Sequence, residues 1–137
     1  MLFRSFLALL YIDLGRLDEA RAIFADIRSR DDFQHLGSLL RDAAKSLEAE
    51  LQLASGDREG ALATLRTLES SVPHALTVWP LADMGRARFQ RAELERELGD
   101  IEVAKRFYHG LDEPWSPWDS FWRPLLYERL EIGRAHV

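Results

Sequence analysis

Apolar residues along this 137-residue chain recur at spacings of three and four, which is the pattern of amphipathic helices. The pattern predicts helices at residues 6–14, 17–29, 38–54, 58–70, 80–98, 101–111 and 119–130. The intervals between them carry the Gly, Pro and Asp residues that are expected at helix ends. The alternation typical of a strand is absent, so the sequence predicts an all-α fold.

Short and long intervals between the predicted helices alternate. A turn of one to three residues joins the helices of a pair, and a longer segment joins one pair to the next. This order predicts an α-solenoid of antiparallel helical hairpins, with about three hairpins and the first helix of a fourth. We expect repeats at approximately 6–33, 38–74 and 80–113, and a partial repeat at 119–130.

Three stretches share one outline, namely LGRLDEARAIF (14–24), SGDREGALATL (55–65) and LGDIEVAKRFY (98–108). Gly15, Gly56 and Gly99 each close a first helix, where glycine adopts a left-handed conformation most easily. Acidic residues in the next first turn favour the positive end of the helix dipole. These residues are Asp18, Glu19, Asp57, Glu59, Asp100 and Glu102.

Alanine recurs at two fixed positions of each predicted hairpin. Ala20, Ala61 and Ala104 follow the glycines by five residues. Each is preceded, twelve residues earlier, by an alanine of the first helix: Ala8, Ala49 and Ala92. Small residues at these positions allow the two helices of a hairpin to approach closely.

These positions resemble the tetratricopeptide repeat family, whose unit has a small residue and an aromatic in its first helix, then Ala and Phe in its second. The first repeat has Leu7, Ala8, Tyr11, Ala20 and Phe24. The second keeps Ala49, Ala61 and the terminal Pro73, and the third keeps Ala92, Ala104 and Tyr108. The aromatic position of the first helix holds Gln52 in the second repeat and Glu95 in the third.

The spacing of the repeats departs from the family's usual length. The glycines lie 41 and 43 residues apart, whereas a tetratricopeptide unit has about 34 residues. Long, degenerate repeats of this kind look like those in large bacterial signalling proteins, which join helical arrays to kinase, cyclase or transcription-activator modules. The resemblance implies an irregular superhelix.

Composition excludes several classes of function. The net charge of −5 and pI near 5.4 argue against nucleic acid as a partner. The longest uncharged apolar run, from Phe6 to Ile12, is far shorter than the roughly 20 residues of a membrane span. The absence of cysteine excludes disulfides and thiolate metal sites and permits a reducing compartment, and we expect a cytoplasmic location.

The sequence offers little that indicates catalysis. Asp31, Asp32 and His35 lie close together, but they occupy an interval where Asp commonly caps the next helix. His74 and His109 have no partner at a ligand spacing. No nucleophile, phosphate-loop or dinucleotide motif is present. We therefore expect no enzymatic activity, no cofactor and no metal site.

Two further groups of residues have alternative interpretations. Glu93, Glu95 and Glu97 alternate by two, so they point in different directions on a helix and are interpreted as a solvated face. The stretch from residue 113 to 124 holds Trp115, Trp118, Phe121 and Trp122. These aromatics either anchor a bound peptide or pin a long connection to the array, and packing is the favoured interpretation, as it is for Trp79 and Pro80.

The sequence thus predicts a non-catalytic scaffold that binds a peptide, a partner protein or another domain of its own parent chain. A concave surface formed mainly by the first helices is expected to make the contacts. Residues that could line it are Arg41, Lys45, Glu48, Arg88, Arg91 and Glu95. The alternative is a sensor segment that binds a signalling peptide or small molecule and controls an attached kinase, cyclase or transcription regulator.

The codons of the two chain ends suggest a common origin. Residues 132–137 can be encoded by ATCGGAAGAGCACACGTC, and residues 1–5 by GTGCTCTTCCGATCT if GTG is the start codon. The reverse complement of the second string overlaps the first when the codon of Glu131 ends in AG, as inverted copies of a ligated short-read sequencing adapter would. The alternative is a coincidence of degenerate codons. We expect residues 1–5 and 131–137 to be adapter-derived and residues 6–130 to be a fragment of a larger, metagenomic bacterial sequence.

Overall fold

The computed structural model describes residues 2–30, 37–68, 84–112, 124–125 and 127–129. These residues form helices α1 (Leu2–Asp13), α2 (Leu17–Arg28), α3 (Ser38–Ala54), α4 (Arg58–Arg66), α5 (Gly85–Leu98) and α6 (Ile101–Asp112). Residues 124–125 and 127–129 are also helical, and none of the described residues is in a strand. The predicted all-α fold is confirmed.

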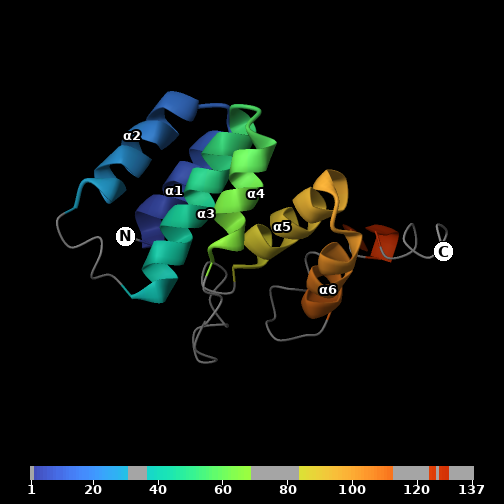
Figure 1. Ribbon diagram of the computed structural model, residues 1–137. Coiled ribbons are helices and arrows are strands. Elements are labelled where there is room, and N and C mark those ends of the chain that lie inside the picture. The colour runs from blue at the N-terminus through green and yellow to red at the C-terminus, as the bar shows by residue number, and fades with distance from the viewer. Residues whose placement is uncertain (1, 31–36, 69–83, 113–123, 126, 130–137) are drawn as a thin grey trace. The chain divides into compact units, whose positions relative to one another are not determined.

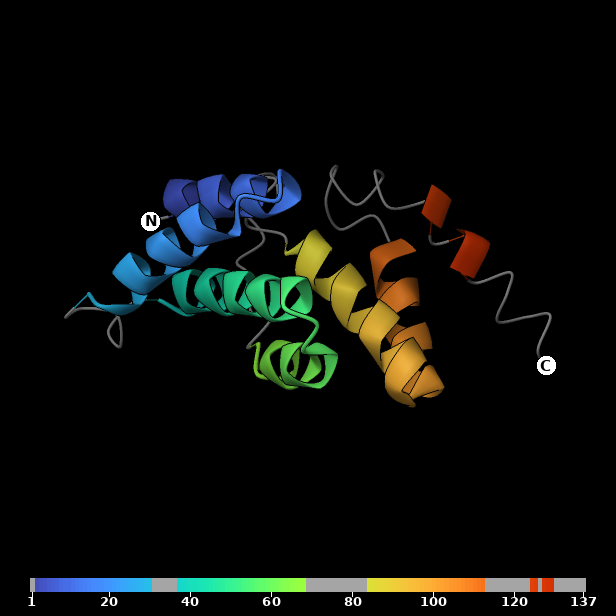
Figure 2. The ribbon, with the colours of Figure 1, turned by 90° about the horizontal axis from the view of Figure 1, so that it is seen from above.

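The chain divides into two compact units, Met1–Ser71 and Val72–Val137. In the first unit α1 packs against α2 and α3 packs against α4, while α3 also contacts both helices of the first hairpin. Figures 1 and 2 show α3 lying between α1 and α4. The first helix of the second hairpin therefore stacks on the whole of the first hairpin, as neighbouring units of a helical repeat do.

The core of the first unit explains this stacking. Ala8 and Ala20 from the first hairpin and Ala44, Leu47 and Leu51 from α3 are buried in one apolar cluster, together with Ile27. Partly buried apolar residues surround the cluster: Leu9, Tyr11, Ile12, Ile23 and Phe24. Burial of such residues is the main favourable contribution to folding, so hairpins one and two form a common core.

The second unit contains the hairpin formed by α5 and α6, which lie side by side in Figures 1 and 2. Ala92 of α5 and Ala104, Tyr108 and Leu111 of α6 are buried together, and Phe89 and Phe107 pack against them. The rings of Phe89 and Tyr108 have centroids 6.2 Å apart and planes inclined by 57°. This tilted geometry is one that aromatic pairs favour.

The same turn closes the first helix of each hairpin. Gly15, Gly56 and Gly99 have φ values of 73°, 83° and 131°. In each case the amide of the following residue donates to the carbonyl five residues earlier, at N–O distances of 2.7 Å to Tyr11, 2.9 Å to Gln52 and 2.9 Å to Glu95. This bond satisfies a carbonyl that the helix itself leaves without a partner.

The second helices begin differently from what the charge pattern alone suggests. Asp57 and Asp100 accept hydrogen bonds from the amides of Gly60 and Val103, at 2.9 Å and 3.0 Å. They are therefore N-caps of α4 and α6, in addition to placing negative charge at the positive helix end. The equivalent residue of α2 is Arg16, which makes no side-chain cap.

Three predicted boundaries of the helices α1 to α6 differ from the structure by more than one residue. Helix α4 ends at Arg66 rather than residue 70, where the amide and hydroxyl of Thr67 both donate to the Thr64 carbonyl. Helix α5 begins at Gly85 rather than residue 80, because Met84 has a left-handed conformation with φ 55° that no helix continues through. Helix α1 begins at Leu2, so residues 2–5, expected to be adapter-derived, form its first turn.

Candidate functional site

The six alanines of the repeat pattern all lie inside the hairpins. Ala8, Ala20, Ala49, Ala61, Ala92 and Ala104 each have 0% of their surface exposed. The aromatic positions of the second helices are occupied by Phe24, which is partly buried, and Tyr108, which is buried. Pro73 lies outside the described residues. The repeated pattern of small residues is thus used for contact between helices, so these alanines are not available to bind a partner.

Three different side chains occupy the aromatic position of the first helices. Tyr11 lies 4.6 Å from the guanidinium of Arg16, measured from its ring centroid. Gln52 accepts a hydrogen bond from the Thr64 hydroxyl of the paired helix at 2.9 Å. Each of these contacts ties the end of the first helix to the turn or to the second helix. The departures from the family pattern are therefore accommodated locally.

The third occupant, Glu95, corrects two predictions. Its side chain is 1% exposed, so it belongs neither to a solvated face nor to a binding surface. Its carboxylate lies 3.8 Å from Nε of Arg91, whose guanidinium lies 4.4 Å from the ring centroid of Phe107. A buried carboxylate needs such a partner because desolvation penalises its charge. Arg91 is thus engaged in the interior of its own hairpin.

The predicted binding residues of α3 are only partly exposed. Lys45 donates to the carbonyl of Thr67 at 2.8 Å, at the end of α4. Glu48 lies 4.0 Å from Arg28 of α2, at the limit of an ion pair. Arg41 is partly buried on the same helix, as is Arg88 on α5. Lys45 and Glu48 therefore connect α3 to its neighbours, and they retain some exposure to solvent.

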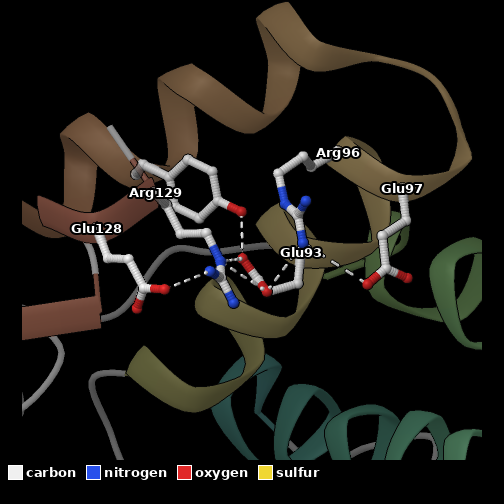
Figure 3. Close-up of polar contacts among 6 residues, drawn as sticks. Glu93, Arg96, Glu97, Glu128 and Arg129 are labelled. Atoms are coloured by element: carbon white, nitrogen blue, oxygen red, sulfur yellow. Dashed lines mark hydrogen bonds and ion pairs between the residues drawn. The ribbon is translucent and has the colours of Figure 1, made fainter. Parts of the chain in front are cut away.

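A connected group of polar side chains centres on Glu93. We call it the Glu93 cluster, and it consists of Glu93, Arg96 and Glu97 of α5, Tyr108 of α6, and Glu128 and Arg129 after α6. Figure 3 shows the Arg129 and Arg96 side chains directed at the Glu93 carboxylate. Nε of Arg129 lies 3.0 Å and 3.2 Å from its two oxygens. The Tyr108 hydroxyl also donates to it.

The contacts within the Glu93 cluster shift the pKa values of Glu93 and Tyr108. Burial acts to raise the pKa of Glu93, but hydrogen bonds from Arg129 and Tyr108 outweigh it and lower the pKa. Burial and the neighbouring Glu93 carboxylate raise the pKa of the Tyr108 hydroxyl far above its usual value. Glu93 therefore stays ionised and Tyr108 stays protonated at neutral pH. Neither group has the pKa near 7 that suits a general acid or base.

Sequence reasoning missed the Glu93 cluster and assigned Glu93 and Glu95 to a solvated face. The spacing of two correctly separates the directions of the side chains, and Glu97 is exposed. The partners that partly cover Glu93 come from 15 and 36 residues later, namely Tyr108 and Arg129. No local pattern in the sequence links these positions. A spacing argument about one helix could not have found them.

The remaining residues considered as catalytic, metal-binding or peptide-binding candidates are either exposed or outside the described part of the chain. His109 is exposed on α6, and within the described residues no group of three or more His, Asp or Glu side chains could hold a metal ion. Asp31, Asp32, His35, His74 and the tryptophan-rich stretch lie outside the described residues. None of the helices that the structure describes is long and apolar enough to cross a membrane.

Comparison with known proteins finds one family that part of the chain resembles. The sequence model of the tetratricopeptide repeat family matches residues 1–26 and 43–67. These residues cover most of the two stacked hairpins of the first unit, which is therefore similar to repeats of this family. Repeats of this family generally mediate protein–protein interactions. No curated protein and no solved structure matches the chain significantly.

Proposed function

We propose that this chain is a non-catalytic helical-repeat scaffold that binds a protein or peptide partner. The observation that supports the proposal is the stacking of α3 on both helices of the first hairpin through Ala44, Leu47 and Leu51. Stacked hairpins place corresponding residues of successive repeats in rows, which makes an extended surface for a partner. The match of this unit to a family of interaction repeats points the same way.

The first helices are the proposed contact layer. On α3, Arg41, Lys45 and Glu48 are all partly exposed, and contacts to α4 and α2 hold Lys45 and Glu48 in position. Side chains held in this way lose less conformational freedom on binding than free surface side chains do. A charged, preorganised row of this kind suits a polar peptide or the surface of a folded protein.

A displayed peptide library tests the proposal on the purified chain. Peptides selected for binding are measured against the parent chain, Arg41→Glu on α3, and Arg66→Glu on the exposed end of α4 as the matched charge reversal. We expect selected peptides to lose affinity for Arg41→Glu and to keep it for Arg66→Glu. Failure to select any peptide above background, or equal binding to all three proteins, would remove the proposal.

A further inference from the structure

One side of α1 carries a row of exposed apolar residues, which we call the α1 face. Its members are Phe3, Phe6, Leu10 and Leu14, and they are 74%, 40%, 42% and 71% exposed. Leu14 follows the last residue of α1, and its amide donates to the Leu10 carbonyl at 3.0 Å, so it continues the row. With about 3.6 residues per turn, the four positions fall within about 80° of the helix circumference, on the opposite side from the buried Ala8. Single exposed apolar residues are ordinary, whereas a contiguous row of large ones marks an interaction surface.

The repeat register shows how the fold uses the same face of another first helix. In α3, the positions five and two residues before Ala49 and two residues after it are Ala44, Leu47 and Leu51. These three residues are buried in the apolar cluster that α3 shares with α1 and α2. The same positions of α1, counted from Ala8, are Phe3, Phe6 and Leu10. The α1 face is therefore the equivalent of a face through which a helix of this chain packs on other helices.

The position of α1 within its unit leaves this face on the outside. In Figure 2, α1 forms one side of the first unit, and α3 and α4 follow it toward the other side. Larger side chains occupy the α1 face than the docking face of α3, since Phe3 and Phe6 stand where α3 has Ala44 and Leu47. The row thus presents more apolar surface than the equivalent row that the chain buries.

The α1 face is complementary to itself when a second copy of the helix runs in the opposite direction. A two-fold axis that passes close to Ala8 places Phe3 opposite Leu14 of the second copy and Phe6 opposite its Leu10, because both pairs are centred at that point of the helix. Each aromatic ring then meets a leucine along the whole row. A contact of this kind uses the same patch on both copies, so it closes at two.

From the register and this symmetry we infer that the α1 face is a self-association surface, through which two copies of the chain form an antiparallel dimer. A Phe side chain buries roughly 150–250 Å², so the four residues expose on the order of 400 Å² per copy. Two copies cover on the order of 800 Å² of this surface, and flanking atoms add to it, whereas stable interfaces cover about 1,200–2,000 Å². The dimer is therefore weak and dissociates on dilution.

Sedimentation velocity of the purified full chain over a dilution series tests the surface. We expect the parent to change from dimer to monomer on dilution, and Leu10→Arg to stay monomeric at every concentration. Leu98→Arg on α5 is the matched control, because Leu98 is an equally exposed apolar residue at 43% and should keep the dimer. Leu14→Arg covers the case in which circular dichroism shows that Leu10→Arg loses helicity, since Leu14 is 71% exposed and lies outside α1.

Three results would overturn the inference. A parent chain that is monomeric at every concentration would mean that another segment covers the α1 face or that water does. Species larger than a dimer would contradict a contact that closes at two. Equal loss of the dimer in Leu98→Arg and Leu10→Arg would assign the association to general apolar exposure.

Disulfide trapping tests the antiparallel arrangement. The chain has no cysteine, so Phe3→Cys and Leu14→Cys each introduce one thiol at an exposed position. After mild oxidation of a mixture of the two variants, we expect disulfides mainly between unlike chains, identified by mass. Disulfides mainly between like chains, or a yield no higher than that of the exposed Ile101→Cys alone, would contradict the arrangement.

Discussion

Gly56 offers a direct test of the turn that closes α3, because a side chain there meets a conformational penalty and no steric obstacle. Its φ is +83°, and a Cβ at this position has nothing within 4 Å. A left-handed conformation costs an L-residue about 1–2 kcal/mol. The reduced freedom of the unfolded alanine chain offsets about 0.4–1 kcal/mol of this. Gly56→Ala should therefore lower the free energy of unfolding by about 1 kcal/mol.

Two control variants separate backbone conformation from other effects. Gly56→Asn should lose less stability than Gly56→Ala, because Asn adopts the left-handed region more readily. Gly110 lies inside α6, also has nothing within 4 Å of its Cβ position, and lacks a left-handed φ. Gly110→Ala should therefore raise the free energy of unfolding by about 0.5–1 kcal/mol, which is the opposite sign for the same chemical change.

Urea unfolding measures both effects, provided that the two compact units are followed separately. All four tryptophans belong to Val72–Val137, so tryptophan fluorescence reports that unit, whereas circular dichroism reports the helices of both. The Gly110→Ala change is read from fluorescence and the Gly56→Ala change from circular dichroism. Equal stability of Gly56→Ala and its parent, or a larger loss in Gly56→Asn than in Gly56→Ala, would refute the reasoning.

Three further predictions concern helix contact, capping and pH. Ala61→Leu should lower stability by about 1–3 kcal/mol through overpacking, as should Ala20→Leu, and unchanged urea midpoints would contradict the close helix contact. Asp57→Ala should cost about 1 kcal/mol because the Gly60 amide loses its acceptor, and a loss no larger than that of the exposed Glu59→Ala would count against the cap. The lowered pKa of Glu93 means that its stabilisation is present above its ordinary value of about 4.3 and disappears as the pH falls through the folded pKa. Glu93→Gln should therefore show a shallower decline of second-unit stability on acidification, measured by tryptophan fluorescence, and identical slopes would exclude this assignment.

The helices and the places where they turn could be predicted because both depend on local signals. A spacing of three and four residues identifies a helix from its own sequence, and glycine marks a left-handed end without reference to distant residues. The ends of α4 and α5 depend on more than that. The carbonyl of Thr67, the residue that follows α4, accepts a hydrogen bond from Lys45 of α3. Met84 adopts a conformation that its residue type does not favour.

Burial of charged residues was the other limit of sequence reasoning. Glu93 and Glu95 look like surface residues because carboxylates are rarely buried without a partner. The partner of Glu95 lies one helical turn earlier on α5, whereas the partners of Glu93 come from α6 and from the residues after it. Arg91 forms an ion pair with Glu95 and a cation–π contact with the ring of Phe107, and Arg129 forms an ion pair with Glu93. The Arg91–Glu95 pair is local, but the burial of Glu95 and the Arg129–Glu93 pair depend on packing between elements, so the solvated-face interpretation failed where tertiary contacts determine exposure.

The three hairpins show which parts of the repeat must stay constant. Tyr11, Gln52 and Glu95 differ in size, polarity and charge, yet the carbonyl of each accepts the same hydrogen bond from the residue after the turn glycine. The turn is formed by backbone hydrogen bonds and requires glycine after the helix. The side chain at the position of Tyr11, Gln52 and Glu95 can therefore vary, provided that a nearby group contacts or pairs with it. The third hairpin keeps the turn glycine and both buried alanines although it lies outside the residues matched to the family. Backbone and small-residue contacts therefore give it the same turn, although Glu95, paired with Arg91, stands where the first hairpin has Tyr11.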